Sequence, residues 1–171
     1  FGVLIGSAFF PSLFAGKTQA LILTPVMLLW INLVTDGLPA LALGIDPKMD
    51  GIMDRAPRGT DEPVINLRIM SSILAIGGVI TLLGLPLFFY GLAATEEIVV
   101  AQTLLFTFIV LAEMIWAQLI RSRYDLSLAS NPWLMGAIAS SLVLHLGLLY
   151  SPLSEYFGVI GPGPTKWGWM A

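Results

Sequence analysis

The chain has 171 residues, of which 57% are hydrophobic and only 11% are charged. Soluble domains carry about 25% charged residues, so this composition excludes a soluble globular domain and indicates an integral membrane protein. The absence of cysteine excludes a disulfide framework and a thiolate metal site. The net charge is −3 and no basic tract is present, so we expect no nucleic-acid partner.

Apolar segments of membrane-spanning length alternate with polar segments along the chain. Because a helix rises about 1.5 Å per residue and needs about 20 apolar residues to cross a bilayer, Phe1–Phe14 is expected to be the end of a helix that begins upstream. The further elements expected, in order, are a broken span over Leu21–Gly44, a charged loop over 45–68, spans over Ile69–Leu92 and Ile98–Ile120, a polar loop over 121–131, a span over Pro132–Tyr150, and a Pro/Gly-rich tail that begins another helix. We therefore predict an all-α, polytopic membrane helix bundle in the lipid bilayer, with residues 1–171 as a single membrane domain.

The basic residues are distributed unevenly between the two sides of this bundle. Six of the eight lie in the loops 45–68 and 121–131, which two intervening spans place on the same side, whereas Lys17 and Lys166 lie on the other. Cytoplasmic loops carry an excess of Lys and Arg. We expect both loops to be cytoplasmic, in a multi-pass protein of the plasma or cytoplasmic membrane.

The broken span contains three polar residues, Asn32, Thr35 and Asp36, in an otherwise apolar stretch. A carboxylate in the middle of a span costs about 3 kcal/mol on insertion scales, so it indicates a functional site by default. Residues i, i+3 and i+4 of an α-helix share a face, which predicts that these three side chains converge. The alternative interpretation is a polar cluster that only joins helices together.

Gly37 and Pro39 predict that the helix is interrupted at the same place. Proline has no N–H, so the carbonyl of Thr35, four residues earlier, loses its helical hydrogen bond, and glycine makes local unwinding easier. Free backbone oxygens at membrane depth are tolerated where they face a cavity or protein. Carbonyl, hydroxyl, amide and carboxylate oxygens together suit a hard cation such as Ca²⁺, which takes roughly six to eight oxygen ligands.

A second intramembrane carboxylate, Glu113, lies in the span Ile98–Ile120. Two explanations remain open: a protonated side chain that is hydrogen-bonded within the bundle, or an ionised one that shares a cation with Asp36. No Lys or Arg lies deep in these spans, which favours a cation as the neutralising charge. His145 stands alone in an apolar helix and is expected to be a packing residue.

The segment LLWINLVTDGLPALALG (28–44) resembles the sixth transmembrane helix of type II P-type cation-transporting ATPases, most closely the calcium pumps of the sarcoplasmic reticulum type and their prokaryotic relatives. PKMDGIMDRAPR (47–58), AIGG (75–78) and LHLGLLYSPL (144–153) resemble later parts of the same family. The resemblance implies a chain that runs from the end of a fifth helix through the sixth to ninth helices into a tenth. It also implies that the sixth helix is unwound.

In the calcium pumps, the residues that match Asn32, Thr35, Asp36 and Glu113 bind the transported ion, so these four are the metal ligands that the resemblance implies. Ca²⁺ is the expected ion, with Mn²⁺ and Na⁺ as alternatives. The loop 45–68 is expected to dock on the cytoplasmic phosphorylation domain of the same parent chain. The family's fifth-helix N-x-G-E ligands, catalytic aspartate and nucleotide-binding domain have no match here, so Mg²⁺ and ATP are expected only in domains outside this sequence.

Three functions remain open at this point. The first is the C-terminal membrane part of an ATP-driven cation pump. The second is a secondary cation/proton antiporter, since broken helices with carboxylates near the membrane midplane also occur there. The third is a membrane accessory protein without transport. The sequence contains no P-loop and no DKTGT-like phosphorylation motif, so we do not expect this chain to hydrolyse ATP by itself.

Overall fold

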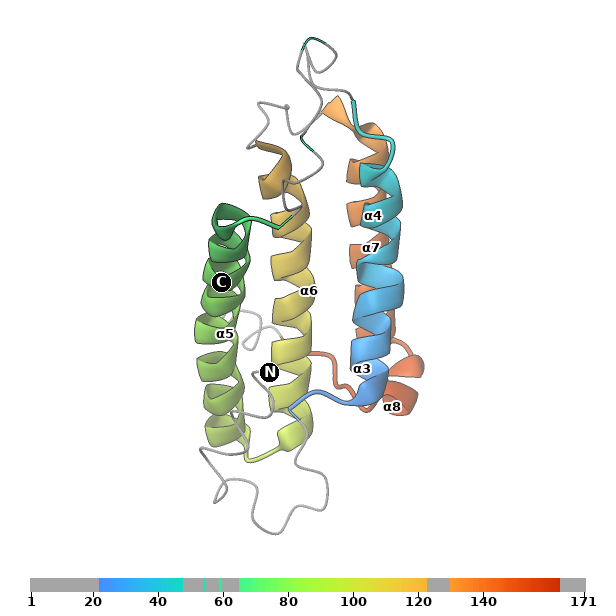
Figure 1. Cartoon of the computed structure of the whole chain (residues 1–171). Helices are drawn as coiled ribbons and strands as arrows, with labels where there is room; N and C mark the ends of the chain where they lie inside the picture. The colour runs from blue at the N-terminus through green and yellow to red at the C-terminus, as the bar shows by residue number, and fades with distance from the viewer. Residues whose placement is uncertain (1–21, 48–53, 55–58, 60–64, 123–129, 164–171) are drawn as a thin grey trace.

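The computed structural model describes residues 22–47, 54, 59, 65–122 and 130–163, and the regular elements in these ranges are all helices (Figure 1). In chain order they are α3 (Pro25–Trp30), the π-helical segment η1 (Ile31–Thr35), α4 (Gly37–Leu43), α5 (Leu67–Thr95), α6 (Ile98–Ser122), α7 (Pro132–Tyr150) and α8 (Leu153–Phe157). The predicted all-α class is confirmed. The partial helix expected at Phe1–Phe14 and the helix start expected at the end of the tail lie outside the described residues.

Four segments of the described chain are long and apolar enough to cross a membrane. They are Pro25–Leu43, Ile69–Thr95, Ile98–Arg121 and Pro132–Tyr150, which correspond one to one to the four predicted spans. Large apolar side chains such as Leu41 and Leu82 face outward. Continuous apolar surface of this kind is typical of a protein surrounded by lipid, and the chain is a multi-pass membrane protein.

The helix starts follow from local sequence signals. The side-chain oxygen of Asn131 accepts a hydrogen bond from the Leu134 N–H at 2.9 Å. Pro132 lies in the first turn of α7, where a backbone N–H has no partner within the helix, so its missing N–H costs no helical hydrogen bond. Thr24 and Asn66 cap α3 and α5 in the same way.

The helices pack as two neighbouring pairs. α5 and α6 form a hairpin closed by a short turn, and the broken helix α3–η1–α4 lies against α7 (Figure 1). α6 also packs against η1, so it connects its own pair to the other. A Cβ on Gly84 would lie 2.8 Å from the Leu105 Cδ1, and one on Gly91 would lie 2.7 Å from the Leu104 Cδ1. Glycines at these positions therefore allow the close approach of α5 to α6, which is typical of small residues between membrane helices.

The sequence prediction was wrong about Arg121, which was assigned to a polar loop. α6 continues to Ser122, and the Arg121 side chain is 2% exposed and forms an ion pair with Asp46. An arginine side chain can be buried at the end of a helix when a carboxylate from another segment forms an ion pair with its guanidinium group.

The sequence prediction was also incomplete in the tail, where a Pro/Gly-rich turn was expected. Residues 153–157 form the short helix α8, which Pro152 precedes as N-cap and Gly158 ends with a φ of 61°. Glycine adopts this left-handed conformation without strain, which explains why the helix stops there.

Candidate cation site

The broken helix changes its hydrogen-bond pattern at the polar motif. The Asp36 N–H donates to the Ile31 carbonyl, five residues back, at 2.9 Å, which makes η1 a π-helical turn. Pro39 has no N–H to offer the Thr35 carbonyl. The predicted break is therefore present as a widened helical turn, and not as extended chain. Such turns are frequent at functional sites.

Thr35 and Glu113 meet across the interface between η1 and α6. The Thr35 side chain is fully buried, and its Oγ1 lies 3.3 Å from the Glu113 Oε2 and 2.8 Å from the Ile31 carbonyl oxygen. The two residues are 78 positions apart in the sequence. The fold thus places the Thr35 hydroxyl within hydrogen-bond distance of the Glu113 carboxylate.

Asn32 and Asp36 have a different environment from Thr35. Both are exposed on the described bundle, on the side of η1 that its neighbours leave uncovered. The Asp36 carboxylate is still near enough to Glu113 for the two charges to interact. The expectation that all three polar side chains share one face assumed α-helical spacing. The π-helical turn changes the angular positions of successive residues, so Thr35 points inward while its two neighbours face outward.

The Thr35 hydroxyl has one hydrogen and two oxygen neighbours, which permits two arrangements. If Glu113 is protonated, it donates to the Thr35 Oγ1, which in turn donates to the Ile31 carbonyl. If a cation is bound, the Thr35 Oγ1 and the Glu113 Oε2 can both be ligands. Two oxygens 3.3 Å apart and each about 2.4 Å from an ion subtend an angle of about 87°, which fits six- or seven-fold calcium coordination.

The oxygens at this site define the class of ion it would accept. In the described part of the chain no group of three or more His, Cys, Asp or Glu side chains is assembled. Two carboxylates, one amide and one hydroxyl are hard ligands, which suit Ca²⁺, Mg²⁺ or Mn²⁺ better than a soft transition metal.

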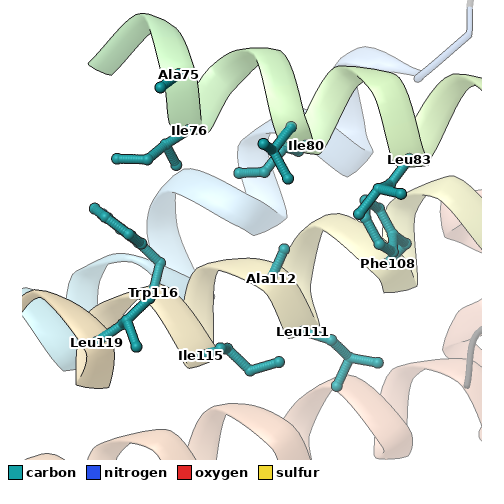
Figure 2. Close-up of a pocket in the computed structure, with 11 residues that line it drawn as sticks. Ala75, Ile76, Ile80, Leu83, Phe108, Leu111, Ala112, Ile115, Trp116 and Leu119 are labelled. Carbon is teal, nitrogen blue, oxygen red and sulfur yellow. The ribbon is translucent and has the colours of Figure 1, made fainter. Parts of the chain in front are cut away.

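A large groove of about 490 Å³ lies elsewhere, between α5 and α6 (Figure 2). Its lining is apolar, with Ile80, Phe108 and Trp116 among the side chains that point into it. It offers no carboxylate or hydroxyl to a cation. The groove is therefore not a candidate for ion binding.

α7 supports the broken helix through polar groups that sequence reasoning missed. The Ser141 Oγ donates to the Val34 carbonyl at 3.1 Å, beside the π-helical turn. The Asn131 Nδ2 donates to the Ala42 carbonyl at 2.9 Å, near the end of α4. These bonds satisfy carbonyls where the helical pattern is interrupted or ends. Contacts across about 90 to 110 residues leave no local pattern in the sequence.

At the end of α4, Asp46 accepts hydrogen bonds from two buried side chains. The Arg121 Nε lies 2.9 Å from one carboxylate oxygen and 3.1 Å from the other, and the Asn131 Nδ2 lies 3.0 Å from Oδ1. The Arg121 hydrogen bond holds the pKa of Asp46 below its usual range. A signal was available in the sequence, because both charges lie at span ends on the same predicted side.

His145 lies inside the bundle, as a packing residue should. Its ring is 1% exposed, contacts the Phe106 ring edge to face at 4.9 Å between centroids, and places Nε2 3.2 Å from the Thr107 hydroxyl. The other ring nitrogen has no hydrogen-bond partner among the described residues. Thr107 and Glu113 lie on the same helix but six positions apart, and no hydrogen bond of the described residues joins His145 to Glu113.

Residues 20–171 match the family described as "Cation transporting ATPase, C-terminus". The chain belongs to this family. The match covers the broken helix, the second carboxylate and all four spans, so the resemblance to the C-terminal membrane region of P-type cation ATPases is confirmed.

Similar members of the cation-transporting ATPase family are named as calcium pumps. The chain is 35% identical to "Calcium-transporting ATPase" of Bacillus subtilis (strain 168) over 85% of its length. It is 33% identical to "Endoplasmic reticulum calcium ATPase srcA" of Aspergillus fumigatus over 89% and to "Probable calcium-transporting ATPase" of Trypanosoma brucei brucei over 82%. These matches span only 17% to 19% of the relatives' own lengths.

Proposed function

We propose that this chain is the C-terminal membrane part of an ATP-driven calcium pump, and that Asn32, Thr35, Asp36 and Glu113 are ligands of the transported ion. The observation that most directly supports this proposal is the 3.3 Å contact between the Thr35 hydroxyl and the Glu113 carboxylate. The Asp36 carboxylate is close enough to interact electrostatically with Glu113. In the described part of the chain, Arg121 is paired with Asp46 and with neither intramembrane carboxylate. A mobile cation then supplies the missing positive charge.

In this proposal the chain holds the ion and exchanges it for protons. With Ca²⁺ bound, the Glu113 and Asp36 carboxylates are ionised and share the charge of the ion. When the ion leaves, Glu113 and Asp36 each take up a proton, and the protonated Glu113 donates a hydrogen bond to the Thr35 Oγ1, whose own hydrogen bonds to the Ile31 carbonyl. The site therefore has a hydrogen-bonded arrangement available in both states, without an unpaired buried charge.

ATP hydrolysis, with its Mg²⁺, belongs in this proposal to domains outside the sequence. The loops 45–68 and 121–131 face the cytoplasm, and the loop 45–68 docks on the phosphorylation domain. Support comes from the relatives, which are more than five times as long as the stretch they share with this chain. The uneven distribution of basic residues gives the same orientation.

The test is calcium-dependent phosphorylation of the full-length protein from ATP in isolated membranes. We expect phosphoenzyme in the wild type at micromolar Ca²⁺ and none above background in Asp36→Asn, because the amide removes the negative charge and one ligand oxygen. Glu155→Gln, which changes an exposed carboxylate in α8, is the matched control and should behave as the wild type. Unchanged phosphoenzyme formation in Asp36→Asn would refute the ligand assignment. Cation/proton exchange without any phosphoenzyme would favour an antiporter.

A further inference from the structure

The end of α4 is joined to two other helices by a partly buried polar cluster that contains none of the four candidate ion ligands. This cluster, here called the clasp, consists of Asp46, Arg121 and Asn131 with Gln118 and Ser130. Arg121 and Asn131 are each 2% exposed. Besides Asp46, Arg121 donates to the Gln118 Oε1 at 3.3 Å and to the Ser130 Oγ at 2.6 Å.

Three members of the clasp, Asp46, Arg121 and Asn131, come from three different parts of the bundle. Asp46 follows the last turn of α4, Arg121 lies in the last turn of α6, and Asn131 is the N-cap of α7. Figure 1 shows these three helix ends together at the top of the bundle. Because Asn131 bonds to both the Ala42 carbonyl and the Asp46 carboxylate, it holds the backbone and the side chain of the same segment.

The clasp attaches side chains of α6 to the segment that follows α4. A second attachment, between α6 and the broken helix, is the contact between Thr35 and Glu113 at the cation site. Glu113 and Arg121 are eight residues apart on one helix, so the attachments are separated by about 12 Å along α6. Together with the apolar packing of Met27 and Ile31 in the core, the two attachments restrain both the separation and the tilt of α4 relative to α6.

The weakest part of the broken helix lies between these two attachments. The π-helical turn ends at Thr35, and Pro39 offers no N–H to the carbonyl four residues back. A displacement of the α4 end can therefore be taken up at residues 35–39, where Thr35 and Asp36 are placed. Movement at the clasp is thereby transmitted to the candidate ligands.

We propose that Arg121 is a positioning residue for the cation site: its ion pair with Asp46, supported by Asn131, sets the distance and tilt of η1 and α4 relative to Glu113. The proposal rests on the proposed function, since it assumes that Thr35, Asp36 and Glu113 bind the transported ion. Arg121 touches neither the ion nor its ligands. Its effect is on how well the ligand oxygens are placed, and so on the affinity for Ca²⁺.

The experiment measures the Ca²⁺ dependence of phosphorylation in the full-length protein for the wild type, Arg121→Met and Arg121→Lys. We expect Arg121→Met to raise the half-saturating Ca²⁺ concentration about fivefold or more while leaving the maximal phosphoenzyme per folded protein unchanged. Arg121→Lys, which keeps a cation near Asp46, should restore part of the affinity. A role limited to stability would lower the amount of folded protein and leave the half-saturating concentration as in the wild type.

Asn131→Ser provides a second variant if Arg121→Met does not fold. Serine keeps a side-chain oxygen for the Leu134 N–H and removes the amide donor to Ala42 and Asp46. The same increase in half-saturating Ca²⁺ is expected, with Glu155→Gln as the unchanged control. Wild-type affinity in both Arg121→Met and Asn131→Ser would overturn the positioning role alone. A wild type that shows no Ca²⁺-dependent phosphoenzyme would overturn the proposed function, and the positioning role with it.

Discussion

At the scale of single residues, Thr35 connects the broken helix to α6. Its hydroxyl lies between the Ile31 carbonyl and the Glu113 carboxylate, and both partners are oxygens. A valine at this position has the same shape without the oxygen. It would leave the carboxylate with one polar neighbour fewer and remove one ligand from the site.

We expect Thr35→Val in the full-length protein to raise the half-saturating Ca²⁺ concentration about tenfold, which corresponds to about 1.4 kcal/mol. Thr35→Ser should remain close to the wild type, because it keeps the hydroxyl. Thr81→Val is the matched control, since the Thr81 hydroxyl bonds to the Gly77 carbonyl within α5. Equal affinity in Thr35→Val and the wild type would show that the hydroxyl is not a ligand.

A second prediction at this scale concerns Asp46 and acid. The Arg121 hydrogen bond holds the folded-state pKa of Asp46 below the unfolded value of about 3.9. The ion pair therefore stabilises the protein above that unfolded value, and this contribution is lost as the pH falls through the lower, folded-state pKa. Melting temperatures of the purified protein in detergent should fall below about pH 4, and less steeply in Asp46→Asn. The prediction fails if the melting temperatures of Asp46→Asn and the wild type fall equally steeply as the pH decreases below about 4. Glu155→Gln is the control and should behave as the wild type.

At the scale of elements, α7 acts as a support for the interrupted helix. Ser140 and Ser141 of α7 allow the contact with the broken helix to be tested separately from the general effect of removing a serine hydroxyl. The Ser141 Oγ donates to the Val34 carbonyl of η1, whereas the Ser140 Oγ donates to the Ala137 carbonyl of its own helix and is exposed. Only Ser141 joins two elements.

We expect Ser141→Ala to lower the free energy of unfolding by about 1 kcal/mol, because a carbonyl at the π-helical turn loses its donor. Ser140→Ala should change it by no more than about 0.5 kcal/mol, as is usual for an exposed substitution. Thermal unfolding in detergent would measure both. A Ser141→Ala variant as stable as Ser140→Ala would mean that α7 supports the broken helix by apolar packing alone.

The sequence predicted those elements that depend on local pattern. Hydropathy located the four spans, and Pro39 with Gly37 predicted the break in the first. The π-helical form of that break was not predicted, because it depends on how α6 and α7 pack against η1. For the same reason the placement of Thr35 on Glu113 could be derived from the resemblance and not from spacing.

The clasp shows a different limit of sequence reasoning. Asp46 and Arg121 were assigned to loops because charges generally indicate solvent, yet Arg121 is buried against Asp46. A hydropathy pattern measures the polarity of each residue and not the presence of a partner. Opposite charges at the ends of two spans on the same side are the feature that would have predicted the pair.

At the scale of the whole molecule, the account requires one orientation in the membrane. The chain contains no cysteine, so in a full-length protein whose cysteines outside this chain are replaced, a single cysteine introduced here reports the side on which that residue lies. In cell membranes, Gly59→Cys should react with an impermeant maleimide only from the cytoplasmic side. Glu97→Cys and Tyr156→Cys, both at exposed positions, should react only from the opposite side. Labelling of positions 59 and 97 from the same side would contradict the arrangement of spans.

The central claim is that the Asp36 and Glu113 carboxylates share one transported cation. Equilibrium binding of radioactive ⁴⁵Ca²⁺ to the purified full-length protein, in the absence of ATP, tests it most directly. The account predicts saturable binding in the wild type and in Thr81→Val, and loss of bound Ca²⁺ at the same free concentration in both Asp36→Asn and Glu113→Gln. Binding in either carboxylate variant with the wild-type affinity and stoichiometry would contradict it.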